Sequence, residues 1–345
     1  MRLQYGQNIL LTGIMINVTM RQDMKLVIII PALNEAKTIG TVIQAIPKHF
    51  DGINQTEIIV VDDGSTDQTV TTAQHNGATV VRHQQNMGVG AAFHTGIRAA
   101  LEADADIIVN IDADGQFNPL DISTLIKPIQ NGTAGFVTAS RFAKKEFLPD
   151  MPAIKKWGNM WMTRIINILT GQNFTDVSCG FRAYSRDTAL QLTLFGHFTY
   201  TQETFIDLTF KRVAMLEVPL KIRGEREFGT SRVASNLWRY GTKAATIIFR
   251  AARDYYSFYF FGIPGVTILG LGILIGLFLA YHYYQTGQTS PYRSLVAVSG
   301  VLMILGLLFF FLSMLADMLH RNRLLLDETL YLSRKAAFKN NAKQQ

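Results

Sequence analysis

Residues 107–116 read IIVNIDADGQ, and this stretch decides the class of fold. Its apolar first half, 107–111, is typical of a buried parallel strand. Asp112 and Asp114 follow directly, so two carboxylates come together just past the carboxyl end of that strand. Carboxylate oxygens suit Mg²⁺ or Mn²⁺, which leave coordination positions open for substrate phosphates, and Gln116 adds an amide oxygen nearby. The stretch therefore predicts a cation site for a diphosphate, such as that of a nucleotide sugar.

Strand and helix patterns alternate on the way to this stretch. The expected strands are 25–31, 57–61, 78–82 and 107–111, and the expected helices are 36–46, 68–75 and 88–103. This order predicts an α/β fold with a Rossmann-like, mainly parallel sheet. The glycines of NMGVG (86–90) do not indicate a dinucleotide-binding dehydrogenase, because Phe93 stands where the next glycine is expected and the motif follows the third strand.

Polar residues follow the other strands in the same way. PALNE (31–35) follows the first strand, and DDGS (62–65) follows the second. The carboxyl ends of parallel strands share one edge of a sheet, so these residues are expected beside Asp112 and Asp114. Acidic side chains there can accept hydrogen bonds from ribose hydroxyls or from a base N–H. A nucleotide-binding edge is the prediction.

Two charge-free apolar segments lie near the end of the chain. Residues 257–280 are long enough to cross a hydrocarbon core of about 30 Å, and 294–316 are nearly as long. Basic residues precede the first segment and follow the second, whereas the loop between them holds only Arg293. The positive-inside rule predicts a multi-pass cell-membrane protein whose large domain and two termini are cytoplasmic. The single cysteine, Cys179, allows no intrachain disulfide and fits a reducing compartment.

Basic charge is concentrated near these segments. Residues 1–220 carry 18 basic and 20 acidic side chains, whereas residues 221–345 carry 15 basic and 6 acidic ones. This distribution favours a membrane surface over nucleic acid as the partner. Residues 154–169 and 236–256 combine apolar and basic residues and fit amphipathic helices in the membrane interface. For 154–169, with Trp157 and Trp161 on its apolar stripe, packing in a soluble core is an equal alternative.

Seven short motifs carry a more specific signal. They are PALNE (31–35), VVDDGSTD (60–67), NMGVG (86–90), DADGQ (112–116), SRF (140–142), CGFRAYSR (179–186) and REFGTSR (226–232). In order and spacing they resemble glycosyltransferase family 2, which has the GT-A fold. More narrowly, they resemble its dolichyl-phosphate-mannose synthase-like branch, which glycosylates polyprenyl phosphates. The two C-terminal apolar segments resemble those of the two-helix members of that branch.

This resemblance implies how the chain is organised. The expected parts are an N-terminal extension (1–24), a GT-A domain (25–232), a juxtamembrane amphipathic helix region (233–256), two transmembrane helices (257–319) and a basic cytoplasmic tail (320–345). By analogy with the two-helix members, the expected assembly is a homo-oligomer, a tetramer.

The resemblance also implies roles for individual residues. The donor nucleotide is expected at Pro31, Leu33, Asn34, Glu35, Asp62, Asp63, Gly88, Asp112 and Ala113. The Mg²⁺ or Mn²⁺ ion is expected at Asp112, Asp114 and Gln116. The expected catalytic residues are Asp114, Arg141, Arg182, Arg226 and Arg232. The acceptor phosphate is expected at Arg141, Arg182, Ser231, Arg232 and Glu203.

Together these features predict a membrane-bound, metal-dependent inverting glycosyltransferase. It is expected to move mannose from a GDP donor or glucose from a UDP donor to dolichyl or undecaprenyl phosphate. A phosphate monoester has a second pKa of about 6, so it is an anion at neutral pH and can attack without a general base.

Other functions remain open from the sequence. Transfer to a lipid or protein hydroxyl would need a carboxylate base such as Glu203 or Asp207. A non-catalytic membrane adaptor would keep the fold and lose the chemistry. A processive polysaccharide synthase is disfavoured, because its Q-x-x-R-W acceptor motif is absent from the sequence.

Overall fold

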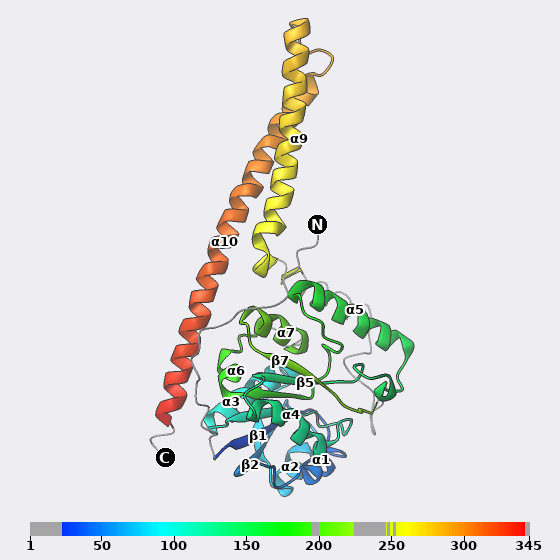
Figure 1. Ribbon diagram of the computed structural model, residues 1–345, viewed down its shortest axis with the longest axis vertical. Coiled ribbons are helices and arrows are strands. Elements are labelled where there is room, and N and C mark those ends of the chain that lie inside the picture. Colours follow the sequence, from blue (N-terminus) through cyan, green and yellow to red (C-terminus); the bar gives the residue numbers. More distant parts are fainter. Residues whose placement is uncertain (1–22, 195–199, 224–245, 247–248, 251–252, 342–345) are drawn as a thin grey trace.

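Figure 1 shows the computed structural model, in which a long helical hairpin rises from one end of an α/β domain. The structure describes residues 23–194, 200–223, 246, 249–250 and 253–341. Most of the predicted N-terminal extension and most of the juxtamembrane region, 233–256, lie outside these residues.

Strands and helices alternate through the first part of the chain, as predicted. The strands are β1 (Lys25–Ala32), β2 (Gln55–Asp62), β3 (Thr79–Arg82), β4 (Ile107–Asn110), β5 (Phe136–Ser140), β6 (Arg182–Ser185) and β7 (Met215–Pro219). The α-helices are α1 (Ile39–Ala45), α2 (Thr69–His75), α3 (Val89–Glu102), α4 (Ile122–Gln130), α5 (Ala153–Thr170), α6 (Arg186–Gln191), α7 (Tyr200–Phe210), α9 (Ser257–Thr286) and α10 (Arg293–Asn341). Two short 3₁₀ helices are η1 (Pro119–Asp121) and η2 (Lys145–Phe147). Helix α1 starts later than predicted, because the carbonyl of Glu35 first accepts from the amides of Thr38 and Ile39 in a turn.

The seven strands form one sheet in the order β3-β2-β1-β4-β6-β5-β7. Strand β6 runs antiparallel to β4 and β5, and the other neighbouring pairs are parallel. The carboxyl ends of β1, β2, β4, β5 and β7 therefore lie at one edge, and β6 begins at that same edge. The predicted α/β class with a mainly parallel sheet is confirmed.

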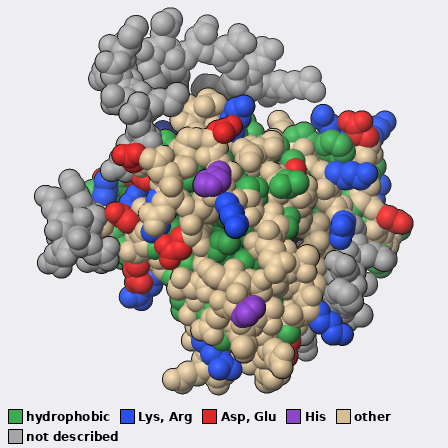
Figure 2. Space-filling model, turned by 90° about the horizontal axis from the view of Figure 1, so that it is seen from below, with side chains coloured by type: hydrophobic (Ala, Val, Ile, Leu, Met, Phe, Trp, Pro, Cys, Tyr) green, Lys and Arg blue, Asp and Glu red, His purple; other side chains and the backbone are tan. Residues whose placement is uncertain are grey.

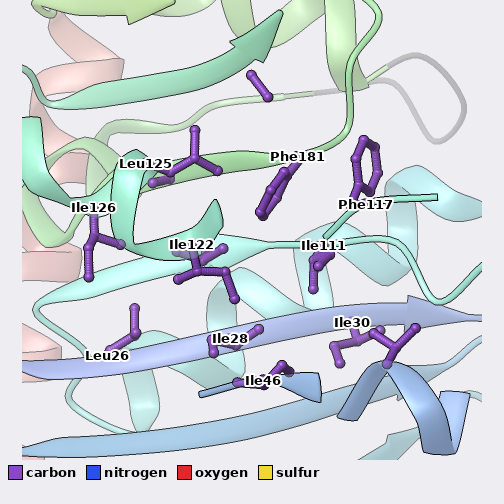
Figure 3. Packing of buried hydrophobic residues seen from close by; sticks show 14 of the residues in the cluster. Leu26, Ile28, Ile30, Ile46, Ile111, Phe117, Ile122, Leu125, Ile126 and Phe181 are labelled. Carbon is purple, nitrogen blue, oxygen red and sulfur yellow. The ribbon is translucent and has the colours of Figure 1, made fainter. Parts of the chain in front are cut away.

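Strand β1 lies at the centre of the core. Residues Leu26–Ile30 are all 0% exposed, because helices cover both faces of the sheet. Successive side chains of a strand point to opposite faces, so Leu26, Ile28 and Ile30 pack on one face and the two residues between them on the other. Figure 3 shows the first face, where these residues meet the buried side of α4. A strand covered on both faces explains the uninterrupted apolar run in the sequence.

Helices α9 and α10 pack closely as an antiparallel pair (Figure 1). A Cβ added at Gly306 of α10 would lie 2.5 Å from the backbone nitrogen of Leu269 on α9. Ser299 donates to the carbonyl of Gly272 across the same interface at 2.9 Å. Small residues allow such close approach between helices in a membrane. By length and composition, both helices can cross a membrane.

Helix α10 continues far beyond the predicted second span and returns to the α/β domain (Figure 1). There Tyr331 donates to Asp187 Oδ1 at 3.2 Å. The Nη1 atom of Arg334 donates to the carbonyls of Leu190 at 3.1 Å and Leu192 at 2.8 Å, at the end of α6. Residues 320–341, for which the sequence predicts a tail, are thus helical, and Tyr331 and Arg334 dock this part of the helix on the domain.

The far end of the α/β domain has a different surface from the hairpin. Figure 2 shows acidic and basic side chains around this end, with hydrophobic side chains visible only in small areas between polar ones. The hairpin exposes large apolar side chains along its length, such as Leu274 (65% exposed) and Leu308 (58%). Contiguous apolar surface of this kind marks a lipid- or protein-facing region.

Candidate functional site

The carboxyl edge of the sheet gathers the predicted site segments. The pairing register places Ala32 beside Asp62 and Ile29 beside Asn110. The loops after β1, β2 and β4 therefore start side by side, and the loop after β5 leaves from the same edge. Ligands of parallel α/β sheets bind at this position.

The loops after β1 and β2 interlock through Asn34. Its backbone N–H donates to Ser65 Oγ at 2.8 Å, and its Oδ1 accepts from the amide of Thr66 at 2.8 Å. Asn34 has a φ of 52°, a left-handed conformation that asparagine tolerates better than most residues. Asn34 is partly exposed at this edge, and so are the predicted donor residues Pro31, Leu33 and Glu35.

Asp62 and Asp63 lie deeper than the sequence predicts, at 0% and 3% exposure. An Asp62 oxygen is 3.2 Å from Arg82 Nε. The two Asp63 oxygens accept from the amides of Met87 at 2.9 Å and Gly88 at 2.8 Å, which fixes the start of α3. Both carboxylates therefore hold loops of the site in place. Arg82 and the two amides thus occupy these carboxylates, in place of the direct donor contacts that the resemblance implies.

Asp112 and Asp114, the predicted cation ligands, follow β4 at the centre of the edge. Asp112 is partly exposed, whereas Asp114 is 2% exposed and accepts from the amide of Gln116 at 3.1 Å. Two carboxylates with the amide oxygen of Gln116 form an all-oxygen set that fits Mg²⁺ or Mn²⁺. Ala113 between them is buried. Within the residues that the structure describes, no three His, Cys, Asp or Glu side chains form a metal-binding group.

The turn before β6 forms one wall of the cation site. A Cβ added at Gly180 would lie 2.9 Å from Oδ2 and 3.0 Å from Oδ1 of Asp112, so any side chain at this position would force the carboxylate to shift. The carbonyl of Gly180 accepts from Asn110 Nδ2 at 2.7 Å. The motif CGFRAYSR contains this glycine, but only the pairing of β4 with β6 shows that it lies beside Asp112.

Arg141 follows β5 and forms a two-pronged ion pair with Asp176. Its Nε and Nη2 donate to Asp176 Oδ2 at 2.6 Å and Oδ1 at 3.0 Å. Burial alone lowers the pKa of Arg141, but the charge and hydrogen bonds of Asp176 outweigh it, and Asp112 adds to them, so the pKa is raised. The Arg141 side chain is 20% exposed. A permanently charged guanidinium thus faces the site near Asp112.

Glu217 on β7 supports this pair, and the sequence analysis missed it. Its carboxylate accepts from the amides of Thr175 at 2.8 Å and Asp176 at 2.9 Å. Burial raises the pKa of Glu217, and these hydrogen bonds offset only part of that rise. A glutamate inside the strand sequence MLEVP is the one available signal, and it does not reveal the partner.

Arg182 lies in the core. It is 0% exposed, with Nε donating to the carbonyl of Cys179 at 2.7 Å and Nη2 to that of Val177 at 3.2 Å. Its guanidinium carbon is 4.9 Å from the ring centroid of Phe205. A sealed guanidinium cannot touch an acceptor phosphate. The acceptor and catalytic contacts predicted for Arg182 are therefore wrong.

Helix α7 carries the two carboxylates considered as general bases. Asp207 is 3% exposed and lies 2.8 Å from Lys211 Nζ. Burial raises the pKa of Asp207, and the charge of Lys211 offsets only part of that effect. Glu203, in the first turn of α7, is partly exposed. Of these two carboxylates, only Glu203 is partly exposed.

Arg226 and Arg232, predicted as catalytic, and Ser231, predicted with Arg232 at the acceptor phosphate, lie outside the described residues. The described chain after β7 runs to Arg223, whose N–H donates to the carbonyl of Gln116 at 3.2 Å. The side chain of Gln116 donates back to the carbonyl of Arg223 at 3.3 Å. The chain therefore passes the cation site three residues before Arg226.

Helix α5 turns an apolar stripe outward. Its exposed members are Ile154 (53%), Trp157 (61%), Trp161 (51%) and Ile168 (73%), and its opposite side is buried. The sequence left open whether this stripe lies in the core or in the membrane interface. The structure places it outside the core, at the end of the domain nearest the hairpin (Figure 1).

Comparisons with known proteins point to one family. Residues 27–192 match the family described as glycosyl transferase family 2. A UDP-N-acetylglucosamine–dolichyl-phosphate N-acetylglucosaminyltransferase of Methanococcus voltae is 36% identical over 48% of this chain and 70% of its own length. An undecaprenyl-phosphate mannosyltransferase of Micrococcus luteus is 27% identical over 62% of this chain and 89% of its own. Glucosyl-3-phosphoglycerate synthase of Mycobacterium tuberculosis, crystallised with Mn²⁺, UDP-glucose and phosphoglyceric acid, is 25% identical over 66% of this chain and 79% of its own, with a TM-score of 0.50.

The chain belongs to glycosyltransferase family 2 and has the GT-A fold, as the motifs predict. Relatives named for dolichyl and undecaprenyl phosphate also confirm the predicted polyprenyl-phosphate branch.

Proposed function

We propose that the chain transfers mannose or glucose from a GDP- or UDP-linked donor to dolichyl or undecaprenyl phosphate, with inversion, at the cytoplasmic face of a membrane. One observation carries the proposal. Asp112 and Asp114 follow β4, and the charge of Asp112 acts on Arg141 of the Arg141–Asp176 pair, in a chain that continues into two long apolar helices. The carboxylates suit a metal-bound diphosphate, the arginine suits a second phosphate, and the helices suit a lipid substrate.

Asp112, Asp114 and Gln116 would hold Mg²⁺ or Mn²⁺, which when bound neutralises the diphosphate of the donor and of the leaving nucleotide. The relative crystallised with Mn²⁺ and UDP-glucose supports this assignment. The partly exposed residues of 31–35 would bind the nucleoside. Their loop is fixed by Asn34, so the donor meets a prearranged surface.

The acceptor phosphate would supply its own nucleophile. One of its oxygens forms a bond to the anomeric carbon while the bond from that carbon to the donor diphosphate breaks. The attacking oxygen carries no proton at neutral pH, so no side chain has to accept one. Arg141, held by Asp176 and close to Asp112, would draw the acceptor phosphate towards the donor against their mutual repulsion.

The membrane would deliver the acceptor to this edge. Basic residues at the outer ends of α9 and the second apolar segment favour a cytoplasmic domain. The exposed tryptophans of α5 suit the headgroup region, where amphipathic aromatic rings gather. A lipid phosphate lying at that depth would be close to the domain without leaving the bilayer.

The test is sugar transfer by the detergent-purified full chain. Radiolabelled UDP- and GDP-hexoses would be supplied with Mn²⁺ or Mg²⁺ and with dolichyl or undecaprenyl phosphate, and the free polyprenols would serve as controls. We expect label in the lipid only when it carries the phosphate. Label in the free alcohol would overturn the proposal and point to a base-assisted reaction. Folded protein that transfers no sugar and hydrolyses no donor would instead support an adaptor.

A further inference from the structure

We propose that Arg182 is a positioning residue of the cation site: from inside the core, it holds the 177–180 turn as the wall against which the Asp112 carboxylate rests. This inference rests on the proposed function, because it takes Asp112 as a ligand of the divalent cation. The resemblance implies that Arg182 contacts the acceptor phosphate, whereas this inference gives Arg182 a positioning role from within the core.

The first step is the contact between the turn and Asp112. The space that a Cβ at Gly180 would occupy is within 2.9 to 3.0 Å of both Asp112 oxygens. The carboxylate therefore fills the space in which a side chain at position 180 would stand. A shift of this backbone by a few tenths of an ångström would move the carboxylate or release it to another rotamer.

The second step is what fixes the turn. Arg182 donates to two of its carbonyls, Cys179 at 2.7 Å and Val177 at 3.2 Å. Asn110 donates to the carbonyl of Gly180 at 2.7 Å from the opposite strand. A planar guanidinium with fixed donor directions can hold two carbonyls at a set spacing, which a lysine ammonium cannot do.

The third step is the cost of placing a charge there. Arg182 is 0% exposed, and none of the ion pairs found among the described residues includes it. Its Nη1 is buried without a hydrogen-bond partner, beside the rings of Phe136 and Phe205. Burying an ion without a counter-ion is strongly unfavourable, and an apolar residue would fill such a site at lower cost. A charged residue at this position is explained if its hydrogen bonds shape the site.

The same turn connects the two halves of the site. Its neighbour Asp176 holds Arg141, and Ser178 in the turn accepts from Gln202 Nε2 at 3.3 Å. One anchored segment thus sets the cation wall and lies next to the phosphate-facing arginine. Displacing this segment is expected to weaken cation binding first, because the Asp112 carboxylate fills the space beside Gly180.

The experiment measures Mn²⁺ binding to the full-length protein in detergent, with GDP or UDP present, by the electron paramagnetic resonance signal of free Mn²⁺. The variants are Gly180→Ala, Arg182→Met and Arg182→Lys. Matched controls are Gly270→Ala, where an added Cβ meets nothing within 4 Å, and Arg98→Met, whose side chain is 78% exposed. Unfolding midpoints are measured in parallel.

We expect each of the three variants to weaken Mn²⁺ binding by roughly 10-fold or more, the usual cost of losing a partner that orients a metal ligand. Arg182→Lys should not restore affinity, and the Michaelis constant for the lipid phosphate should change far less than the Mn²⁺ requirement. If Arg182→Met does not fold, Gly180→Ala decides alone, because it keeps the arginine and disturbs only the wall.

Unchanged Mn²⁺ affinity in Gly180→Ala, with binding intact in the wild type, would overturn this inference and leave the proposed function standing. Mn²⁺ affinity restored by Arg182→Lys would also overturn it, because charge rather than geometry would then be responsible. A wild-type protein that binds no Mn²⁺ with either nucleotide would overturn the inference together with the metal-dependent function.

Discussion

The carboxyl edge of the sheet and the C-terminal helix α10 are built on opposite principles. At the edge, side chains from β1, β2, β4 and β5 converge through strand pairing, and most of their contacts are hydrogen bonds between short loops. Helix α10 is one continuous element of 49 residues that packs on α9 at one end and on α6 at the other. We therefore expect changes at the edge to affect catalysis strongly and stability weakly, and changes along α10 to do the reverse.

The strongest test of this contrast is Asp114→Ala. A metal ligand that stabilises a departing diphosphate contributes several kcal/mol, so transfer should fall by roughly 10³-fold or more. The unfolding midpoint should change little. Asp51→Ala, at an exposed loop position, is the matched control and should keep full activity. An Asp114→Ala enzyme with more than a tenth of wild-type turnover would contradict the assignment of this edge as the cation site.

Arg141→Lys probes the second half of the edge. Lysine keeps the charge but loses the two-pronged contact with Asp176, so the group that faces the acceptor is no longer fixed in direction. We expect roughly a 10²-fold loss of kcat/KM, the size of effect seen when a transition-state donor is removed. Arg98→Lys, on an exposed pair with Glu102, is the control. Equal activity of the two variants would leave Arg141 as a structural residue only.

The two regions also differ in how far the sequence predicts them. Strand ends are marked by residue type, so the convergence of 31–35, 62–65 and 112–116 could be predicted from periodicity alone. No residue type marks how deeply a side chain is buried or which partner it contacts. The sequence shows an arginine at 182 and an aspartate at 63, but not that the core seals the first and that two amides occupy the second.

The same limit applies to α10. Its apolar part is evident as a membrane span, because charge is absent over a sufficient length. The part after Arg321 mixes charged and apolar residues and was predicted as a tail. Its docking depends on a few long-range contacts, such as Tyr331 with Asp187, which local patterns cannot show.

Arg334→Ala tests that docking. Its guanidinium supplies hydrogen bonds to the carbonyls of Leu190 and Leu192, and their loss leaves two carbonyls without these partners. We expect a loss of about 1–3 kcal/mol in stability, seen as an unfolding midpoint lower by a few degrees, with turnover within about twofold of wild type. Arg321→Ala, whose side chain is 76% exposed, is the control. A large loss of turnover at an unchanged midpoint would show that α10 takes part in catalysis.

Replacing Trp157 and Trp161 together by serine tests the lipid-facing role of α5. Both rings are more than half exposed, so their removal should leave the fold intact while weakening contact with the membrane interface. We expect the Michaelis constant for the lipid phosphate to rise by a few-fold, with no change for the nucleotide sugar. Leu216→Ser, at a 39% exposed apolar position on β7, is the control. A rise in the donor constant instead would place these tryptophans near the nucleotide.

The smallest effect is expected from Glu203→Gln, and it separates the two reaction types that the edge can support. If the acceptor is a phosphate, its attacking oxygen is already deprotonated, so a neutral amide at 203 should reduce turnover only about twofold to threefold. If the acceptor is a hydroxyl, Glu203 is the partly exposed carboxylate left on α7, because Asp207 is buried against Lys211. Loss of a general base then costs roughly 10²- to 10⁴-fold. The pH profile gives an independent test. Wild-type activity that follows the second ionisation of the lipid phosphate, with the same midpoint in Glu203→Gln, supports the base-free reaction. A midpoint that disappears when the glutamate is replaced supports the hydroxyl acceptor.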